Sequence, residues 1–272
     1  MPKTPVFEGI EGLSLVRRKR FGQHFLRDPE VIERTVAAIA PRRGQRVVEI
    51  GPGTGALTRA LVETLETLDV IEMDRDLAAG LQDSLGTHTR VRIHRDDALK
   101  FDLCSLASPG AKIRLVGNLP YNISSPLLFH VLDHLECVED MVFMLQKEVA
   151  ERITAAPSTR CYGRLSVMVR YRCDADLLFV IGPTAFAPPP KVDSALIRLA
   201  PRPLPETLLD DNTFARVVTH AFAHRRKTLH NALRGMIDDV GLHAAGISPS
   251  ARGETLSVSE FVRLANYIAR PG

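Results

Sequence analysis

The sequence predicts an α/β protein with a doubly wound, mixed sheet and a small all-helical C-terminal domain. Three features of the 272 residues predict this. Short apolar runs typical of buried strands alternate with helical patterns up to about residue 200. A glycine-rich turn joins the first of these strands to a helix. After Pro201, Pro203 and Pro205, which mark a linker, only helical periodicity remains.

The strands are predicted from short apolar runs bounded by turn residues. The early strands alternate with helices, so parallel pairing through right-handed crossovers is expected. Antiparallel strands near the end would make the sheet mixed. The predicted strands are residues 47–50, 68–72, 91–94, 113–116, 141–145, 177–181 and 195–199.

The helices are predicted from apolar residues three and four positions apart and from capping residues. Asp28 followed by Pro29 is a strong helix start, because Asp accepts from the first free amides and Pro has no amide to lose. Ser257 caps the last helix in the same manner. The predicted helices are residues 29–39, 56–63, 75–84, 126–134, 148–154 and 165–171, with more helices after residue 206.

The net charge of +3 is modest, but the basic excess lies at the two ends of the chain. Residues 1–28 hold six Lys and Arg against three acids, and residues 201–272 hold nine against seven. Basic clusters flanking a neutral core fit an anionic polymer partner, although solvated faces would have the same composition. The two clusters are Arg17, Arg18, Lys19 and Arg20, and Arg225, Arg226 and Lys227.

Composition argues against several other classes of protein. No apolar run approaches a membrane span and no secretion signal is recognised, so a cytoplasmic protein without membrane association is expected. The four cysteines form no C-x-x-C and match no zinc spacing, so neither a structural disulfide nor a metal site is predicted. The i,i+4 histidine pairs lack a third ligand and are interpreted as ordinary helix-face residues: His130 with His134 and His220 with His224.

A G-x-G-x-G turn at Gly51, Gly53 and Gly55 follows the first strand. Glycine lets backbone approach a ligand at the carboxyl end of a strand, where a Cβ would interfere. Glu72 ends the second strand 21 residues after Gly51, the distance at which a carboxylate accepts from both ribose hydroxyls. Glu49 precedes the turn, favours a cationic ligand and disfavours a pyrophosphate. The pattern indicates S-adenosylmethionine, which carries a sulfonium and an ammonium but no phosphate.

The fourth strand is followed by Asn118-Leu119-Pro120-Tyr121. Methyl transfer to an aromatic amine depends mainly on positioning, because the methyl donor is already activated. Asn118 offers a side-chain carbonyl to the amine, and the backbone of Leu119 or Pro120 offers a second acceptor. Tyr121 offers a ring on which an extruded base can stack. Such a turn is also common as a purely structural feature, and its position after the glycine turn and Glu72 favours the functional interpretation.

At these residues the chain resembles the ribosomal RNA adenine dimethylases of KsgA type. The resemblance rests on FGQHFL, EIGPGTGALT, IEMDRD, DDA, GNLPYNISSP, FAPPPKVDSA and FAHRRKTLHNAL, and covers residues 17 to about 234. It implies a Rossmann-like class I methyltransferase fold with a small helical C-terminal domain. It also implies dimethylation of two adjacent adenosines in the 3′-terminal hairpin of 16S ribosomal RNA, in the small ribosomal subunit.

The resemblance also implies roles for individual residues. His24 departs mildly from the family, which often has Asn there. Tyr121 and Phe186 would stack on the target adenine. His24 and Leu26 would border the cofactor, and Gly51, with Gly53 beside it, would touch its methionine part. Glu72 would bind the ribose and Asp97 the adenine amine of the cofactor. Asn118 would lie between the cofactor and the target base.

Three parts of the chain follow from the motifs and the resemblance. Residues 1–28 are predicted to be a basic arm, residues 29–200 the S-adenosylmethionine-binding catalytic domain, and residues 201–272 a helical RNA-binding domain. A monomer that acts on the small ribosomal subunit, without metal or membrane, is expected.

Three alternatives remain at the level of the sequence. Enzymes that methylate an adenine of 23S ribosomal RNA and confer macrolide resistance share the glycine turn and an Asn-Pro-Tyr-like motif, but FAPPPKVDSA and RRKTL argue against them. A mainly non-catalytic assembly factor would not need the set of Gly51, Glu72, Asp97 and Asn118. A nicotinamide oxidoreductase is disfavoured by the glycine spacing and by Glu49.

Overall fold

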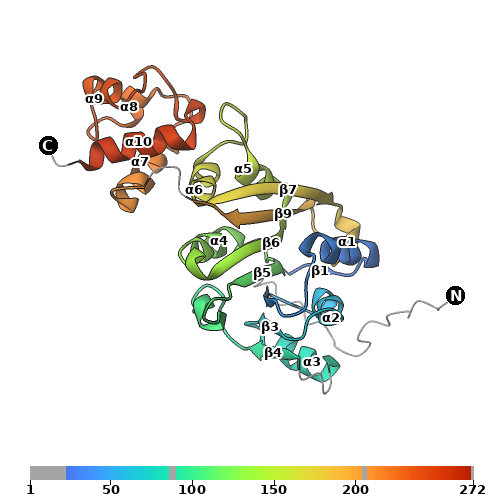
Figure 1. Ribbon diagram of the computed structural model, residues 1–272. Helices are drawn as coiled ribbons and strands as arrows, with labels where there is room; N and C mark the ends of the chain where they lie inside the picture. The colour runs from blue at the N-terminus through green and yellow to red at the C-terminus, as the bar shows by residue number, and fades with distance from the viewer. Residues whose placement is uncertain (1–22, 86–89, 204–206, 271–272) are drawn as a thin grey trace. The chain divides into compact units, whose positions relative to one another are not determined.

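The computed structural model describes residues 23–85, 90–203 and 207–270 (Figure 1). Seven strands form one sheet in the order β4-β3-β2-β5-β6-β9-β7, and β1 pairs with β8 in a second, two-stranded sheet. The strands are β1 (Phe25–Leu26), β2 (Arg46–Ile50), β3 (Leu68–Ile71), β4 (Val91–His94), β5 (Ile113–Asn118), β6 (Val138–Gln146), β7 (Cys173–Ile181), β8 (Phe186–Ala187) and β9 (Ser194–Pro201).

The early strands pair in parallel, as predicted. β2 pairs in parallel with β3 on one side and with β5 on the other, and β3 pairs with β4. β2, β3 and β5 are almost wholly buried, as continuous apolar strands in a parallel sheet should be. Because parallel strands end at the same edge, the segments after Ile50, Ile71 and Asn118 lie together there.

The late strands make the sheet mixed, as predicted. Figure 1 shows β7 and β9 running in opposite directions. β6 and β7 both begin earlier than the apolar runs that predicted them. In β7 exposed and partly buried residues alternate, so its polar half, Cys173–Asp176, gives no apolar signal.

The predicted helices are present, with shifts of a few residues at their ends. Asp28 caps α1 as predicted, since its Oδ1 accepts from the amides of Glu30 and Val31. None of the helices in the described ranges has the length and hydropathy of a membrane span. The helices are α1 (Pro29–Ile39), α2 (Ala56–Val62), α3 (Arg75–Leu85), α4 (Ser124–Leu132), α5 (Lys147–Thr154), α6 (Arg164–Arg172), α7 (Asp211–Ala223), α8 (Leu229–Ala232), α9 (Asp239–Ala244) and α10 (Val258–Ala269).

Helices cover both faces of the parallel strands. In Figure 1, α1, α2 and α3 lie on one side of the sheet and α4 on the other. α4 was predicted to begin at Pro126 but begins at Ser124, because a proline is tolerated in the first turn of a helix. The buried Arg114 of β5 donates to the carbonyls of Ile39 and Ala40. These two carbonyls at the C-terminal end of α1 have no partner within the helix, and Arg114 supplies their hydrogen bonds.

The chain divides into two compact units. Unit 1 comprises residues 1–138, 142–144 and 181–192, and unit 2 comprises residues 139–141, 145–180 and 193–272. This division differs from the predicted boundary at residue 200, because α6 shares an apolar core with the C-terminal helices. Tyr171 and Phe214, for example, have ring centroids 4.9 Å apart.

The core of unit 2 is built mainly from α6, α7 and α10. The Tyr162 hydroxyl donates to the carbonyl of Leu256, and burial raises the pKa of this phenol to about 12. Ser257 caps α10 in a reciprocal arrangement with Glu260, as predicted from the sequence. The apolar faces of these helices therefore define one helical core.

One sequence-based prediction about the cysteines is wrong. Cys104 and Cys137 form a disulfide with a Cα–Cα separation of 5.4 Å, whereas no structural disulfide was expected. The two residues lie in the 3₁₀ turns η1 (Leu103–Leu106) and η2 (Leu135–Cys137), which the fold of unit 1 brings together. Spacing along the chain gave no signal, because 33 positions separate them.

Candidate active site

A cavity lies at the carboxyl edge of the parallel strands, within unit 1. In α/β proteins this edge is where ligands bind. Four separate segments form it: the stretch around β1, the turn after β2, the end of β3 and the turn after β5. The lining residues are Gln23, His24, Phe25, Leu26, Glu49, Gly51, Pro52, Gly53, Thr54, Ala56, Leu57, Glu72, Asn118, Leu119, Pro120 and Tyr121.

The glycine turn requires glycine for two reasons. Gly51, Gly53 and Gly55 have φ of 67°, 58° and 80°, in the left-handed region that other residues avoid. A Cβ on Gly53 would lie 2.8 Å from the Phe25 ring, and one on Gly55 would lie 2.4 Å from a methyl of Leu81. The turn therefore presents bare backbone to the cavity while neighbouring side chains pack against it.

Glu72 stands at the wall of the cavity and is 5% exposed. Its Oε1 accepts from the amide of Asp74 at 2.9 Å, and its Oε2 accepts from the amide of Gly53 at 3.3 Å. Burial raises the pKa of Glu72, and these amides oppose the rise. The two hydrogen bonds orient the carboxylate, and each oxygen retains a lone pair for a ligand hydroxyl.

Glu49 lines the same cavity and is 2% exposed. Its Oε2 accepts from the hydroxyl of Thr58 at 2.7 Å. Burial raises the pKa of this carboxyl to about 7, and the Thr58 hydrogen bond opposes that rise. A cationic group beside Glu49 would favour the ionised carboxylate, whereas an anionic one would be repelled.

The turn after β5 holds Asn118 in one orientation. Its Nδ2 donates to the backbone carbonyl of His24 at 2.8 Å. The acceptor atom Oδ1 is therefore the atom that Asn118 can offer to an amine. The Pro120 carbonyl accepts from the amide of Ile123 and closes the turn, while the amide of Leu119 donates to Met144.

The stretch before α1 is attached to the chain around residue 187, a pairing that the sequence did not predict. β1 and β8 pair antiparallel, with Phe25 opposite Ala187 and Leu26 opposite Phe186. The Nδ1 atom of His24 lies 2.7 Å from the carbonyl oxygen of Pro188. The rings of His24 and Tyr121 have centroids 5.3 Å apart, so His24 packs beside the predicted base-stacking ring.

Of the predicted catalytic and cofactor-binding residues, the structure brings nine together and leaves two, Asp97 and Phe186, outside the lining. Asp97 does not line the cavity, and its Oδ1 accepts from the amide of Leu99. Phe186 is 1% exposed and lies in β8, which pairs with β1. The predicted residues that do line the cavity are His24, Leu26, Gly51, Gly53, Glu72, Asn118, Leu119, Pro120 and Tyr121.

Six further lining residues were not singled out from the sequence. Gln23 and Phe25 belong to the FGQHFL motif, so the motif itself marked them without assigning them a role. The other four flank the glycines and are Pro52, Thr54, Ala56 and Leu57. These four residues line the cavity because the backbone of the turn passes along it. Their side-chain types alone did not indicate a ligand site.

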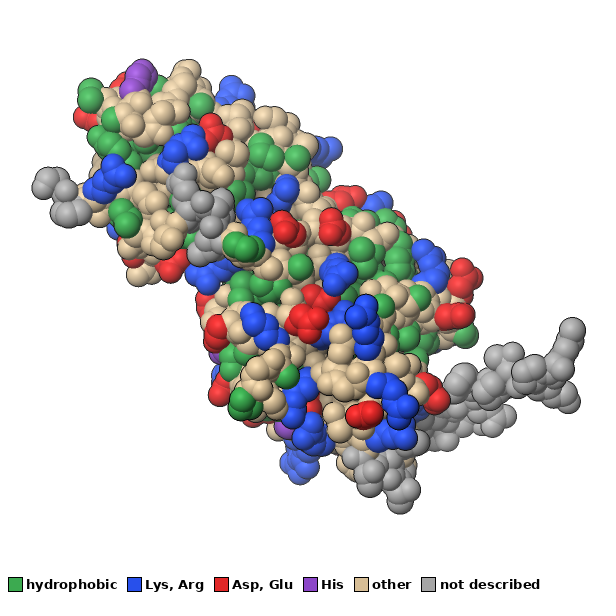
Figure 2. All heavy atoms as spheres, viewed as in Figure 1, with side chains coloured by type: hydrophobic (Ala, Val, Ile, Leu, Met, Phe, Trp, Pro, Cys, Tyr) green, Lys and Arg blue, Asp and Glu red, His purple; other side chains and the backbone are tan. Residues whose placement is uncertain are grey.

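The basic cluster of unit 2 is exposed, but its members differ. Arg225 donates through Nη2 to Oε2 of Glu254 at 2.9 Å and through Nη1 to the carbonyl of Arg160. Arg226 and Lys227 are exposed. On the face drawn in Figure 2, basic and acidic side chains are interspersed. The other predicted cluster lies outside the described residues: Arg17, Arg18, Lys19 and Arg20.

The donor set of the cavity fits a cationic nucleoside ligand. Bare backbone at Gly51 and Gly53 admits close approach, and Glu72 offers two oriented carboxylate oxygens for a diol. Glu49 at the end of β2 would be ionised more readily beside a cationic group. S-adenosylmethionine has these three features: a compact charged tail, a ribose diol and positive charge.

Comparisons with known proteins identify the family of the chain. A model of the ribosomal RNA adenine dimethylase family matches residues 15–270. A Pseudomonas aeruginosa protein named ribosomal RNA small subunit methyltransferase A is 52% identical over 94% of this chain and 96% of its own length. A protein of the same name from Acinetobacter baylyi is 52% identical over 92% of each chain.

Solved structures show the same fold. A dimethyladenosine transferase from Plasmodium falciparum has a TM-score of 0.73 and 25% identity over 89% of this chain and 96% of its own. The 23S ribosomal RNA methyltransferase ErmE has a TM-score of 0.68 and 26% identity over 90% of this chain and all of its own. With a family match over nearly its whole length and relatives about half identical to it, the chain belongs to the ribosomal RNA adenine dimethylase family.

Proposed function

We propose that the protein transfers methyl groups to the N6 amines of two adjacent adenosines in the 3′-terminal hairpin of 16S ribosomal RNA, with S-adenosylmethionine as donor. The full-length relatives are named ribosomal RNA small subunit methyltransferase A, which supports the choice of subunit. The single structural observation that carries the proposal is the placement of Asn118 and Tyr121 in the same cavity as the glycine turn and Glu72.

The cofactor would be held by three groups of the cavity. Its methionine part would lie along the backbone at Gly51 and Gly53, its ribose on Glu72, and its positive charge near Glu49. When bound, it would supply an electrophilic methyl group. The protein's own contribution is to hold the acceptor in line with this methyl and to exclude water.

Asn118 would accept from the reacting amine through Oδ1, because Nδ2 is engaged by the His24 carbonyl. Acceptors on the two amine hydrogens favour pyramidal nitrogen, which localises its lone pair and aims it at the methyl. A second acceptor would come from the backbone of Leu119 or Pro120. No strong base is needed, since the methylated amine is acidic and loses its proton to solvent.

Tyr121 lines the cavity, so its ring would stack on the target adenine. Phe186 is buried, so it would stack on the adenine only after β8 or its ring moved. Arg226 and Lys227 would contact phosphates of the RNA. Arg225 would instead keep its ion pair with Glu254 and stabilise this part of unit 2. The expected monomeric state and cytoplasmic location stay predictions.

A second candidate, methylation of 23S ribosomal RNA, is favoured by the likeness to ErmE. The two functions separate in one experiment. Purified protein with methyl-labelled S-adenosylmethionine is offered unmethylated small subunits and, separately, 23S RNA, and the products are digested and mapped by mass. Dimethyladenosine at adjacent positions of 16S RNA is expected. Label confined to 23S RNA would replace the proposal with the second candidate, and binding without label would indicate an assembly factor.

A further inference from the structure

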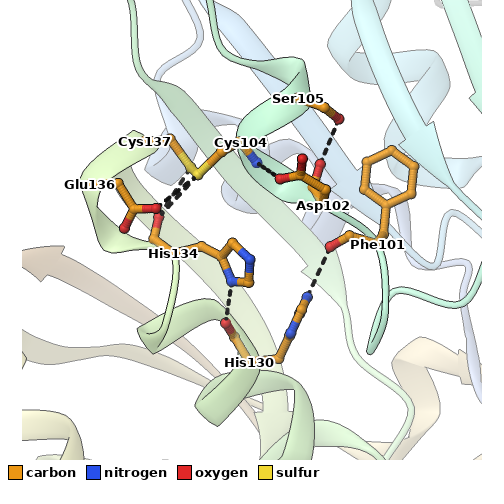
Figure 3. The surroundings of a disulfide bond; sticks show 8 residues. All are labelled: Phe101, Asp102, Cys104, Ser105, His130, His134, Glu136 and Cys137. Atoms are coloured by element: carbon orange, nitrogen blue, oxygen red, sulfur yellow. Dashed lines mark hydrogen bonds between the residues drawn. A yellow bond between two sulfur atoms is a disulfide. The ribbon is translucent and has the colours of Figure 1, made fainter.

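The disulfide lies in an environment of additional metal-ligating groups (Figure 3). Sγ of Cys104 is 3.2 Å from Oε1 of Glu136, and Sγ of Cys137 is 3.1 Å from the carbonyl oxygen of His134. The two sulfurs and a carboxylate oxygen of Glu136 all lie within 4.8 Å of one another. Three potential ligands therefore converge at one point, two of them soft and one hard.

The segments that carry these ligands are held in place by contacts that do not involve sulfur. Asp102 caps η1 by accepting from the amide of Cys104 at 3.0 Å. His130 and the carbonyl of Phe101 lie 3.0 Å apart and tie α4 to the segment before η1. η2 leads directly into β6, so Cys137 immediately precedes the first residue of a strand. The ligand groups would therefore stay close together after the disulfide opened.

We propose that the reduced pair, with Glu136, is a binding site for a thiophilic divalent cation such as Zn²⁺. Tetrahedral zinc takes thiolate at about 2.3 Å and carboxylate at about 2.1 Å, so ligand atoms lie under 4 Å apart around it. Breaking the disulfide would leave the two sulfurs free to separate to that distance. The fourth position is left to water. Disulfide and metal exclude each other, because both use the same two sulfurs.

The chemistry of the exchange is balanced. A dithiol reductant donates two electrons and two protons, the bond between the sulfurs of Cys104 and Cys137 breaks, and the reductant leaves as its own disulfide. Cation binding then displaces both thiol protons to solvent. No other redox partner is required. The site shares no residue with the motifs of the proposed active site and does not depend on that function.

Cobalt(II) is the probe, because it occupies zinc sites and reports its ligands by absorption. The full chain is reduced with dithiothreitol, freed of it without oxygen, and titrated with Co²⁺. One equivalent should bind with a thiolate charge-transfer band, and Zn²⁺ should displace it. Oxidised chain should give no such band. Glu136→Gln, at an exposed position, should weaken binding at least tenfold, and Cys104→Ser should abolish the band.

Cys161→Ser is the matched control, since Cys161 is a free cysteine of unit 2. It should leave the titration unchanged. The proposal is overturned if the reduced chain gives no charge-transfer band, if Cys161→Ser removes it, or if Glu136→Gln binds as tightly as the parent chain. Because Glu136 is exposed, its variant keeps the test valid even where a cysteine variant does not fold.

Discussion

Asn118 shows how one hydrogen bond decides what a side chain can do. A side-chain amide offers two N–H donors and one acceptor oxygen, and one Nδ2–H of Asn118 donates to the His24 carbonyl. This bond fixes the orientation of the amide, and its Oδ1 is the acceptor that an attacking amine needs. The adjacent Tyr121 provides a face for the base. The chemical assignment of this turn therefore depends on a contact 94 residues away in sequence.

Replacing Asn118 with Ala should lower kcat about a hundredfold or more and change KM for RNA much less, because the contact strengthens as the nitrogen pyramidalises. Single-turnover methylation of immature small subunits at saturating cofactor measures this. Asn122→Ala is the control, since Asn122 is exposed and outside the cavity lining. Near-normal turnover by Asn118→Ala would mean that the amine is held elsewhere.

Glu72→Ala should weaken S-adenosylmethionine binding by about 1.5–3 kcal/mol, the scale of hydrogen bonds to a charged group. This corresponds to roughly tenfold to a hundredfold in Kd. Calorimetric titration of the folded variant gives the value, with the exposed Glu63→Ala as control. Unchanged affinity would remove Glu72 from the cofactor site.

Glu49 predicts a pH dependence of cofactor binding. Its pKa of about 7 leaves it mostly protonated at pH 6, and a cationic ligand prefers the ionised form. Affinity for S-adenosylmethionine should therefore fall roughly five- to tenfold between pH 7.5 and pH 6. Glu49→Gln should bind more weakly at pH 7.5 and lose this dependence. A variant with the same pH profile as the parent would contradict the assignment.

The same carboxyl affects stability with the opposite sign. The folded state holds the proton up to about pH 7, whereas the ordinary pKa of the carboxyl is 4.5. Between these values the folded chain binds more protons than the unfolded chain, so raising the pH lowers the free energy of unfolding. As the pH rises towards 7, Glu49 therefore lowers the free energy of unfolding of the protein without cofactor. Over the same pH range its ionisation raises the affinity for a cationic ligand.

At the scale of elements, two pairings organise the site. The β1–β8 pair attaches the stretch that carries His24 to the segment that carries Phe186. Gly117 lets β5 lie against the end of β2, because a Cβ there would be 2.3 Å from the Ile50 carbonyl oxygen. Together these contacts bring the turn after β5 and the glycine turn onto one cavity.

The disulfide should contribute measurably to stability. Closing a loop across 33 positions removes unfolded-state entropy worth about 3–4 kcal/mol. Reduction, or Cys104→Ser, should lower the free energy of unfolding by about this amount in urea titrations. Cys173→Ser is unsuitable as a control because Cys173 is buried, so Cys161→Ser serves instead. Equal stability of oxidised and reduced chains would show that the pair does not constrain the unfolded chain.

At the scale of the whole molecule, the described basic cluster and the cavity belong to different compact units. Cofactor binding and RNA binding should therefore respond to different mutations. Arg225 is part of an ion pair with Glu254, whereas Arg226 and Lys227 project into solvent. Only the latter two are predicted to make phosphate contacts without disturbing the fold of unit 2.

Replacing Arg226 and Lys227 with Ala should weaken RNA binding and flatten its salt dependence by about 0.7–0.9 log–log slope units per lost contact. Cofactor affinity should stay the same. Arg216→Ala, at an exposed position of α7, is the matched control. A slope identical to that of the parent chain would make the cluster an ordinary solvated surface.

Much of the fold follows from local pattern. Short apolar runs predicted the strands, and the capping residues Asp28 and Ser257 predicted where two helices begin. Both signals come from residues that are neighbours in the sequence, so they can be recognised without the tertiary structure. The glycine turn and Glu72 were likewise identified by spacing alone. Both line the cavity, since parallel strands end at one edge of the sheet.

Other features depend on contacts between residues far apart in the chain, for which spacing carries no signal. The β1–β8 pair, the Asn118–His24 hydrogen bond, the Cys104–Cys137 disulfide and the core shared by α6 with α7 are all of this kind. The sequence by itself determined the strands of the main sheet, most of the helices and their order along the chain. Only the tertiary structure decided how the Asn118 amide is oriented, that Phe186 is buried and which cysteines meet, because burial and partnership are properties of packing between distant segments.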